Sequence, residues 1–433
     1  MLSVEENERL TQVGPGTPTG ELLRRYWYPV ATSADLADNP VRSVLILGEQ
    51  LTLFRDGKGR LGLINQRCAH RKVDLVVGIP EEDGIRCPYH GWKYDISGQC
   101  IEQPAEPAES TFKERIKLKS YAVQEMGGLI WGYLGPAPAP LLPNWFIFVL
   151  ENSFRQVGTT VVPCNWLQCQ ENSADTVHAE FMHGTWFRYI LDRAGNQDKD
   201  KRAFANMWLR KHSKLAWEPF EHGIRKFRLQ EGQDEATTRS WQIGHPMVFP
   251  NVVLIGGPGY SEFQIRVPMD DTHTWHLIYQ VFSPGPTVQV PEQNPVPTFH
   301  VPIHELPDYV LGQDMRLWEL QGEITDRFEE RLAESDKGVI LLRKQLQEQV
   351  SIVEDGGEPI NVFRDPSKNE RIDLPFYDIP LDRYVPGVVK SLSQGQWSPH
   401  MERIDQMLIE GAEAERLANG FSELEASNQL EIG

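Results

Sequence analysis

The sequence predicts an α+β protein with two unequal domains, a small antiparallel β domain followed by a larger domain in which helices pack on a curved antiparallel sheet. Three observations lead to this prediction. Short strand-like runs crowd residues 42–138, a proline-rich segment follows at 135–144, and helical patterns then alternate with further strand-like runs. The 433 residues are enough for two or three domains of ordinary size.

Residues 1–41 are expected to form an N-terminal segment that packs on the larger domain, because Leu22, Leu23 and Tyr26 fit one face of a short amphipathic helix. Residues 42–138 form the predicted β domain, where runs such as VRSVLILGE, RLGLIN and GLIWGYLG are separated by glycine-containing turns. The segment GPAPAPLLPN contains four prolines and is interpreted as the linker out of this domain.

Residues 139–433 form the predicted larger domain. It opens with a strand at about 156–163 and a helical stretch at about 166–183, before strand-like runs such as HPMVFPNVVLIGG and THTWHLIYQVF. A helix is predicted over about 335–350, since Val339, Leu346 and Val350 share one face. The segment from 401 onwards is acidic and amphipathic, which is typical of a solvated helix with a loose tail.

The formal charge of −18, from 43 Lys and Arg against 61 Asp and Glu, argues against a nucleic-acid partner, because phosphate binding requires a basic surface. No apolar run approaches the length of a membrane span, and the acidic N-terminus lacks the features of a secretory signal, so a cytoplasmic location without a membrane partner is expected. Five cysteines in such a chain favour metal binding or buried thiols over a disulfide framework.

Four of the potential metal ligands occur as two Cys–His pairs. Cys68 and His70 lie in one loop of the β domain, and Cys87 and His90 lie in another. If the cysteines bind one iron and the histidines the other, the result is a 2Fe-2S cluster of the Rieske type, whose potential exceeds that of an all-cysteine cluster. Zinc is the alternative, but structural zinc motifs pair like ligands at spacings that this chain lacks. Cys100 lies outside both loops and is expected to be a buried thiol.

A second constellation follows in NWLQCQENSADTVHAEFMHG, where Asn172 and Asp175 precede His178 and His183. Two imidazoles and one carboxylate form the facial triad of non-haem iron(II) oxygenases, which leaves coordination positions open for dioxygen and substrate. Taken alone, a His-x4-His pair is a weak signal, since core histidines produce the same pattern. Its occurrence beside a cluster motif favours the iron site, because a cluster needs an electron acceptor.

With both motifs in view, the sequence resembles the oxygenase (α) subunit of Rieske non-haem iron aromatic ring-hydroxylating oxygenases, in the phthalate 4,5-dioxygenase-like branch. The resemblance rests on the contexts CAHR and CPYHGW and on four further blocks that extend it over nearly the whole chain: VGPGTPTGELLRRYW, GHPMVFPN, RVPMDDTHT and ESDKGVILLRKQLQEQ.

The resemblance implies that Cys68, His70, Cys87 and His90 bind the cluster and that His178 and His183 bind the mononuclear iron. It also implies a homotrimer in which Asp175 bridges His178 to the counterpart of His90 in a neighbouring subunit, and Asn172 is a further candidate catalytic residue.

For the third iron ligand the sequence favours Asp336, which opens a predicted helix on the face that carries Val339 and Leu346. Asp326 and Asp314 are held in reserve, because an Asp in a first helical turn also commonly complements the helix dipole.

The activity implied is O2-dependent hydroxylation of an aromatic compound, expected to be an aromatic acid. Without a dinucleotide-binding GxGxxG motif, the electrons are expected from NADH through a separate flavin-containing reductase, with or without a ferredoxin. Cations considered for the substrate carboxylate are Arg188, Arg193, Arg202, Arg210 and Lys214. Apolar residues considered for the pocket are Trp186, Phe187, Tyr189, Met207, Trp208, Met247 and Phe249, each of which suits ordinary core equally well.

Three hypotheses about the activity stay open, of which hydroxylation of the aromatic ring is the first. Phthalate-type members tend to have Arg after the Trp that precedes the equivalent of His245, whereas this chain has Gln242, which argues against phthalate itself. Oxidative O-demethylation or diaryl-ether cleavage of lignin-type aromatics would use the same iron chemistry. A non-enzymatic Rieske electron carrier with an unrelated second domain is the third alternative.

Overall fold

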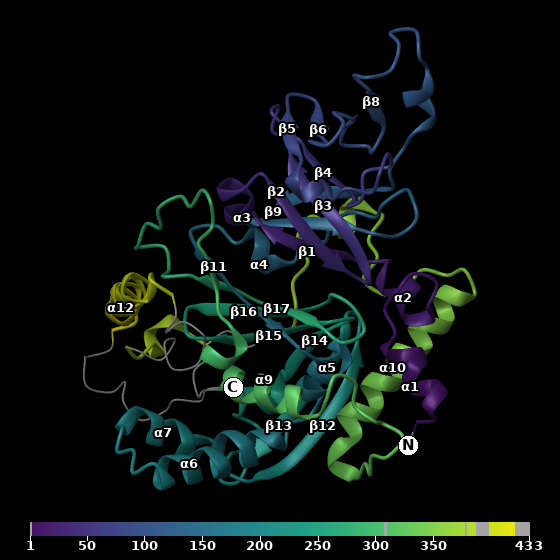
Figure 1. Ribbon diagram of the computed structural model, residues 1–433. Coiled ribbons are helices and arrows are strands. Elements are labelled where there is room, and N and C mark those ends of the chain that lie inside the picture. The colour runs from purple at the N-terminus through teal and green to yellow at the C-terminus, as the bar shows by residue number, and fades with distance from the viewer. Residues whose placement is uncertain (1, 307–309, 377–378, 387–397, 421–433) are drawn as a thin grey trace.

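The computed structural model describes residues 2–306, 310–376, 379–386 and 398–420, and its strands form three sheets with helices around the largest (Figure 1). This arrangement confirms the predicted α+β class. A six-stranded antiparallel sheet has the order β1 (Trp27–Thr32), β10 (Leu129–Tyr133), β9 (Ser120–Met126), β4 (Leu61–Asn65), β3 (Glu49–Arg55), β2 (Val41–Ile46). A small antiparallel sheet beside it contains β5 (Ile79–Glu81), β6 (Gly84–Arg86), β7 (Lys93–Tyr94) and β8 (Cys100–Glu102).

One predicted boundary differs from the structure. β1 lies inside the predicted N-terminal segment 1–41, yet it pairs with β10 from Trp27↔Tyr133 to Thr32↔Leu129, so the six-stranded sheet begins before residue 42. All six residues of β1 are buried, so the strand lacks the polar alternation that marks a half-exposed strand. The helices before it, α1 (Val4–Thr11) and α2 (Pro18–Leu23), contact helices α5 (Trp166–Ala174) and α10 (Lys337–Glu354).

The eight-stranded sheet forms the floor of the larger domain. Its order is β12 (His212–Phe220), β13 (Gly223–Gln230), β14 (His245–Val248), β15 (Val252–Gly257), β16 (Tyr260–Pro268), β17 (Thr274–Phe282), β11 (Phe154–Val162), β18 (Thr298–His300). Its pairs are antiparallel except β11–β18, which is parallel. β16 and β17 are almost wholly buried, because helices cover one face and the domain core covers the other.

Helices α5 (Trp166–Ala174), α9 (Val310–Leu320) and α10 (Lys337–Glu354) pack together on this sheet, with α5 against β16 and α10 against α5 and β12. The other helical segments are α3 (Ser33–Asp38), α4 (Phe146–Val149), α6 (Phe187–Arg193), α7 (Lys199–Trp208), α8 (Arg239–Gln242), α12 (Met401–Ala418), the π-helical η3 (Ala179–Trp186), and the short η1 (Leu75–Val77), η2 (Phe112–Arg115), η4 (Ile303–Glu305), η5 (Glu334–Asp336), η6 (Pro366–Lys368) and η7 (Leu381–Arg383). α12 occupies the start of the predicted acidic tail, and residues 421–433 of that tail lie outside the described residues.

A buried ionic network anchors α5. Glu171 accepts hydrogen bonds from the guanidinium of Arg327 at 2.8 Å and from that of Arg343 on α10 at 2.6 Å. Arg343 also pairs with Glu330 at 2.7 Å, and Arg327 also donates to Asn7 on α1 at 3.1 Å. The network therefore ties α5, the helix that leads into the second motif, to both α1 and α10.

Candidate metal centres

The two Cys–His loops meet at the end of the small sheet. The Cys68 and Cys87 side chains are buried, whereas His70 is exposed and His90 half-buried. The two imidazole rings lie 4.5 Å apart between centroids. Each loop is closed by its own backbone, since Cys68 N–H donates to Val73 O and Cys87 N–H donates to Trp92 O. Two inner thiols and two outer imidazoles are the donor set that a Rieske cluster requires.

Two aromatic residues support these loops: Trp92, which belongs to the CPYHGW context, and Tyr94, which the sequence did not single out. The Tyr94 hydroxyl lies 3.2 Å from Cys68 Sγ and accepts from Ala69 N–H at 3.1 Å, and Trp92 stacks on His70 with centroids 4.6 Å apart. Tyr94 therefore places a hydroxyl next to a thiolate ligand. Cys100 is buried outside the loops, as expected.

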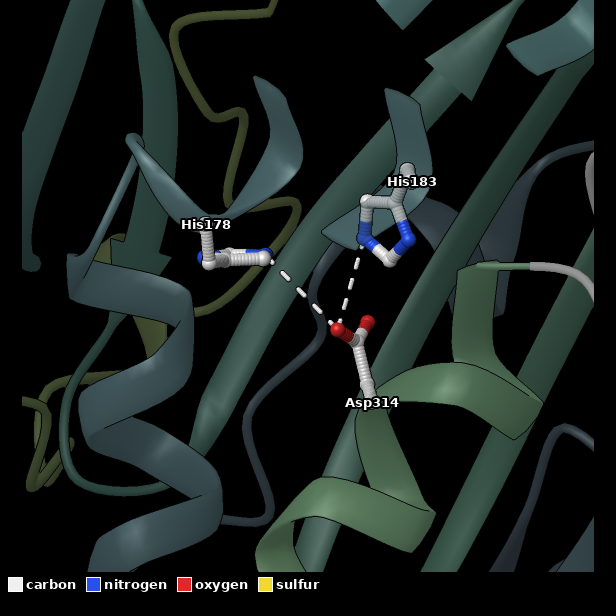
Figure 2. Close-up of side chains that lie close together, drawn as sticks. All are labelled: His178, His183 and Asp314. Atoms are coloured by element: carbon white, nitrogen blue, oxygen red, sulfur yellow. Dashed lines mark ion pairs between the residues drawn. The ribbon is translucent and has the colours of Figure 1, made fainter. Parts of the chain in front are cut away.

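The second centre brings His178, His183 and Asp314 together, with ligand atoms all within 4.8 Å of one another (Figure 2). Asp314 Oδ1 lies 3.6 Å from His178 Nε2 and 3.4 Å from His183 Nε2. The segment η3 is π-helical, and because its hydrogen bonds span five residues, positions 178 and 183 return to the same side. Gly184 is required here, since a Cβ would lie 2.8 Å from the Trp208 backbone at the end of α7.

The other ring nitrogen of each histidine has a partner of its own. His178 Nδ1 lies 3.2 Å from Asp175 Oδ2, and His183 Nδ1 lies 2.7 Å from Gln313 Oε1, the residue before Asp314 on α9. Because Gln313 offers His183 an acceptor, Nδ1 carries the proton and the Nε2 lone pair faces the Asp314 carboxylate. A lone pair opposite a carboxylate needs a cation between them, so the group fits a divalent metal with two imidazoles and one carboxylate.

Both carboxylates of this centre keep their negative charge. Burial alone would raise the pKa of Asp314, but His183 and then His178, when protonated in the absence of a metal, hold it below its usual value, and a cation bound between them would act in the same direction. The same balance lowers the pKa of Asp175, where burial is outweighed by the hydrogen bond and charge of His178 and by the Val177 N–H.

The choice of Asp336 as third ligand is corrected by this geometry. Asp336 lies at the start of α10, where its Oδ2 accepts a hydrogen bond from Ala333 N–H at 2.7 Å. It is therefore a residue of a helix start and not a member of the group around His178 and His183. Asp326 is also outside the group, and Asp314, the other reserve, takes the position. Asn172 is brought to the same place, with Nδ2 3.5 Å from Asp314 Oδ1.

A cavity of about 90 Å³ adjoins the three residues. Its helical side includes Asn172, Asp175, His178, His183 and Asp314, and its sheet side includes Lys226, Arg228, His245, Gln264 and Arg266. Of the apolar residues considered for the pocket, Trp208 lines this cavity. Trp186 and Tyr189 are exposed on the surface instead.

The cations considered from sequence are not among the cavity-lining residues. Arg188 and Arg202 pair with Asp192, and Lys214 pairs with Glu235 on the surface. Lys226, Arg228 and Arg266 take their place. Sequence reasoning missed them because basic residues in strands are usually exposed. The available signal was the two-residue spacing of Ile224, Lys226 and Arg228 on one face of β13, where Ile224 is buried.

Within residues 2–306, 310–376, 379–386 and 398–420, no helix is both long enough and apolar enough to cross a membrane.

The fold and its two centres together define a class of protein, one that joins a Rieske-type domain to an α+β domain with a 2-His-1-carboxylate group. A family model for the Rieske 2Fe-2S domain matches residues 26–122. The chain is 37% identical to the 5,5'-dehydrodivanillate O-demethylase oxygenase subunit of Sphingobium sp. over 93% of each chain. It is 30% identical to the phthalate 4,5-dioxygenase oxygenase subunit of Pseudomonas putida over 83% of this chain and 89% of the relative.

Among solved structures, Pseudomonas putida CBB5 NdmA with caffeine shares the fold, with a TM-score of 0.59 and 21% identity over 79% of this chain and 94% of that chain. The chain belongs to the family of Rieske oxygenase α subunits. It is therefore the oxygenase component of a Rieske oxygenase, with a 2Fe-2S cluster, a mononuclear iron, O2 as co-substrate and an electron-transfer partner. The non-enzymatic carrier alternative is set aside.

Proposed function

We propose that the protein oxidises an aromatic compound in the cavity beside His178, His183 and Asp314, which hold the mononuclear iron. The observation that carries the proposal is this 2-His-1-carboxylate group on the wall of a cavity. Iron(II) held by these three residues would supply the activation of dioxygen beside the substrate.

The residues around the iron perform three tasks in this proposal. Asp175 and Gln313 hold the Nδ1 protons of the two histidines, so both Nε2 lone pairs are aimed at the metal. Asn172 places an amide beside Asp314 and orients its carboxylate. The cavity provides a position for the substrate beside the proposed iron ligands.

Cys68, His70, Cys87 and His90 bind the cluster in this proposal, and the cluster and iron communicate between subunits. The sheet β5–β8, whose loops carry these four residues, lies at the opposite end of the molecule from α5 and α9, with the six-stranded sheet between them (Figure 1). The cluster and iron of one chain are therefore far apart. In a homotrimer, the cluster of a neighbouring subunit would lie close to the iron of this chain. Asp175 then links His178 to the neighbour's counterpart of His90, and the electrons come from NADH through a separate flavin-containing reductase, with or without a ferredoxin.

Two reaction outcomes are considered for the aromatic compound. In ring hydroxylation by dioxygenation, the ring takes up both oxygen atoms of O2 with two electrons and two protons and gives a dihydrodiol. In O-demethylation, one oxygen atom enters a methyl C–H bond to give a hemiacetal that breaks into a phenol and formaldehyde, and the other leaves as water. The second outcome is favoured by the 37% identity to an O-demethylase subunit over 93% of each chain.

The test combines the anaerobically purified, iron-loaded protein with NADH and a flavin-containing reductase under ¹⁸O₂. Methoxylated and unmethoxylated benzoates and biphenyls serve as substrates. Formaldehyde released in proportion to the NADH consumed supports O-demethylation, and ¹⁸O retained on the ring supports ring hydroxylation. NADH consumption with neither product from any of these compounds would contradict the proposal.

A further inference from the structure

Three cations on the sheet side of the cavity have no role in holding iron. Lys226 and Arg228 lie two residues apart on β13, and Arg266 lies on β16. All three line the cavity next to the proposed iron ligands. Arg228 also lies over the Trp208 ring, 5.0 Å from its centroid. Side chains of this kind are costly to desolvate, so their position beside a reaction site requires an explanation.

Among the residues that the structure describes, the ammonium of Lys226 lacks a hydrogen-bond or ion-pair partner. Loss of hydration and then the charge of Arg228 lower the pKa of Lys226 to about 8, although Asp175 and Asp314 act in the opposite direction. An ammonium in this position is stabilised by a bound anion, because no carboxylate of the described residues lies within ion-pair distance of it.

Arg266 is fixed in place by neutral groups. Its Nη atoms donate to the side-chain oxygens of Gln170 at 3.3 Å and Gln264 at 2.9 Å, and the guanidinium lies 5.8 Å from the Trp318 centroid. In the described part of the chain, its Nε has no hydrogen-bond partner. Arg266 therefore contributes a positive charge to the cavity that none of its hydrogen-bond partners cancels.

The charge balance of the cavity is positive. Three cations face two carboxylates, Asp175 and Asp314, and ferrous iron adds two further positive charges. His245 adds none, because burial and the neighbouring cations Arg228 and Lys226 hold its pKa well below the ordinary value. A cavity with this balance attracts an anionic ligand and disfavours a neutral one of the same shape.

We infer that the cavity contains a carboxylate-binding subsite in which Lys226 pairs with the carboxylate of an aromatic acid, within the positive field of Arg228 and Arg266. This inference rests on the proposed function and names the residue that would bind the carboxylate of the aromatic acid expected from the sequence. It also assigns selectivity to a residue that touches neither the iron ligands nor the cluster loops.

The experiment compares Lys226→Met, which removes the charge at similar length, with Lys226→Arg, which keeps it. Lys344→Met is the matched control, because Lys344 is 70% exposed on α10 and pairs with Glu348. Isothermal titration calorimetry under anaerobic conditions measures the Kd of two acids, 3-methoxybenzoate and biphenyl-3,3'-dicarboxylate, and of their amides. Circular dichroism and the visible absorbance of the cluster verify that each variant is folded.

At least one acid should bind the wild-type protein at least about 10-fold more tightly than its amide. Lys226→Met should weaken acid binding by about 10- to 100-fold and leave amide binding within about 3-fold. Lys226→Arg and Lys344→Met should keep the preference for acids. Equal binding of acid and amide by the wild type, binding of neither, or an unchanged preference in Lys226→Met would overturn the subsite.

Failure of the subsite and failure of the proposed function give different results. If acids bind in a Lys226-dependent way but no oxygenated product forms with the reductase, the subsite stands and the proposed function fails. If neutral amides are oxidised as well as acids, and Lys226→Met changes neither rate, the proposed function stands and the subsite is wrong.

Discussion

Gln313 and His183 form a hydrogen bond of 2.7 Å between Oε1 and Nδ1, and the residue after Gln313 is Asp314, which faces the other nitrogen of the same imidazole at 3.4 Å. Two consecutive residues of α9 therefore define both the tautomer of His183 and the position at which its Nε2 would bind a cation. A single helix thus supplies a ligand and the support for another ligand.

Gln313→Leu should weaken binding of the mononuclear iron by about 10- to 100-fold, because it removes the acceptor that fixes the His183 tautomer. Competition with a ferrous chelator measures this change, and the cluster absorbance should stay the same. Gln313→Glu keeps an acceptor and should retain iron. Equal iron affinity in Gln313→Leu and wild type would show that the hydrogen bond does not support the ligand.

Asp314→Ala should lose the mononuclear iron and its nitric oxide adduct in EPR, because two imidazoles alone bind iron(II) weakly. Asp336→Ala should retain both, since its carboxylate accepts from Ala333 N–H and is not among the residues grouped with the two histidines. The Rieske EPR signal should be present in both variants. Loss of nitrosyl iron in Asp336→Ala with retention in Asp314→Ala would reverse the assignment of the third ligand.

Asp175→Asn should keep both metal centres but slow reduction of the iron by the cluster by at least about 10-fold, since an amide neither carries the charge nor accepts from two imidazoles equally. Single-turnover experiments with a pre-reduced cluster measure this rate. Glu218→Gln, an exposed change on β12, serves as the control. An unchanged rate in Asp175→Asn would argue against the bridging role.

Glu171→Gln should destabilise the protein by about 3 kcal/mol at pH 7, because it leaves Arg327 and Arg343 buried beside a neutral amide. Burial would raise the pKa of Glu171, but the charges of Arg327 and then Arg343 lower it below 4.5. Its stabilising contribution is therefore complete above the unfolded pKa near 4.5 and is lost as pH falls through the lower folded pKa.

Denaturant unfolding of Glu171→Gln and wild type at several pH values tests this dependence. The difference in unfolding free energy should be largest near neutral pH and should shrink below about pH 4. Glu348→Gln, in an exposed pair with Lys344, should differ from wild type by less than about 1 kcal/mol. A difference that is constant from pH 7 to pH 3 would exclude the ionic explanation.

Lys226→Met should stabilise the ligand-free protein at pH 7. A pKa lowered from 10.5 to about 8 means that folding disfavours the charged ammonium, by about 3 kcal/mol at about 1.4 kcal/mol per unit. The penalty is complete below pH 8 and disappears as pH rises towards 10.5. The gain in Tm should therefore shrink in alkaline buffer. Destabilisation at pH 7 would show that Lys226 has a stabilising partner.

The cluster motif could be read from the sequence because each loop is short and its ligands are close neighbours. Once Cys68 and His70 occupy one tight turn and Cys87 and His90 another, only the meeting of two loops is left to tertiary structure. His178 and His183 were also accessible, because they lie on one continuous segment. Their relative direction required the π-helical geometry of η3, which local residue preferences do not predict.

The identity of the third carboxylate depended on packing alone. No residue next to Asp314, Asp326 or Asp336 in the sequence marks one of them as a ligand, and the helical pattern around Val339 favoured Asp336. α9 packs against α5 and η3, and that contact turns Asp314 towards His178 and His183 while α10 turns Asp336 away.

The positions of the cationic side chains in the cavity also depend on tertiary structure. Lys226 is separated from Arg266 by three strand connections, and only the register of the sheet brings both to one face. Local residue order is therefore sufficient for short-range ligands and for the family, whereas the remaining ligand and the selectivity of the cavity depend on contacts between residues far apart in the chain. Their positions result from the burial of apolar faces, which no single segment can determine.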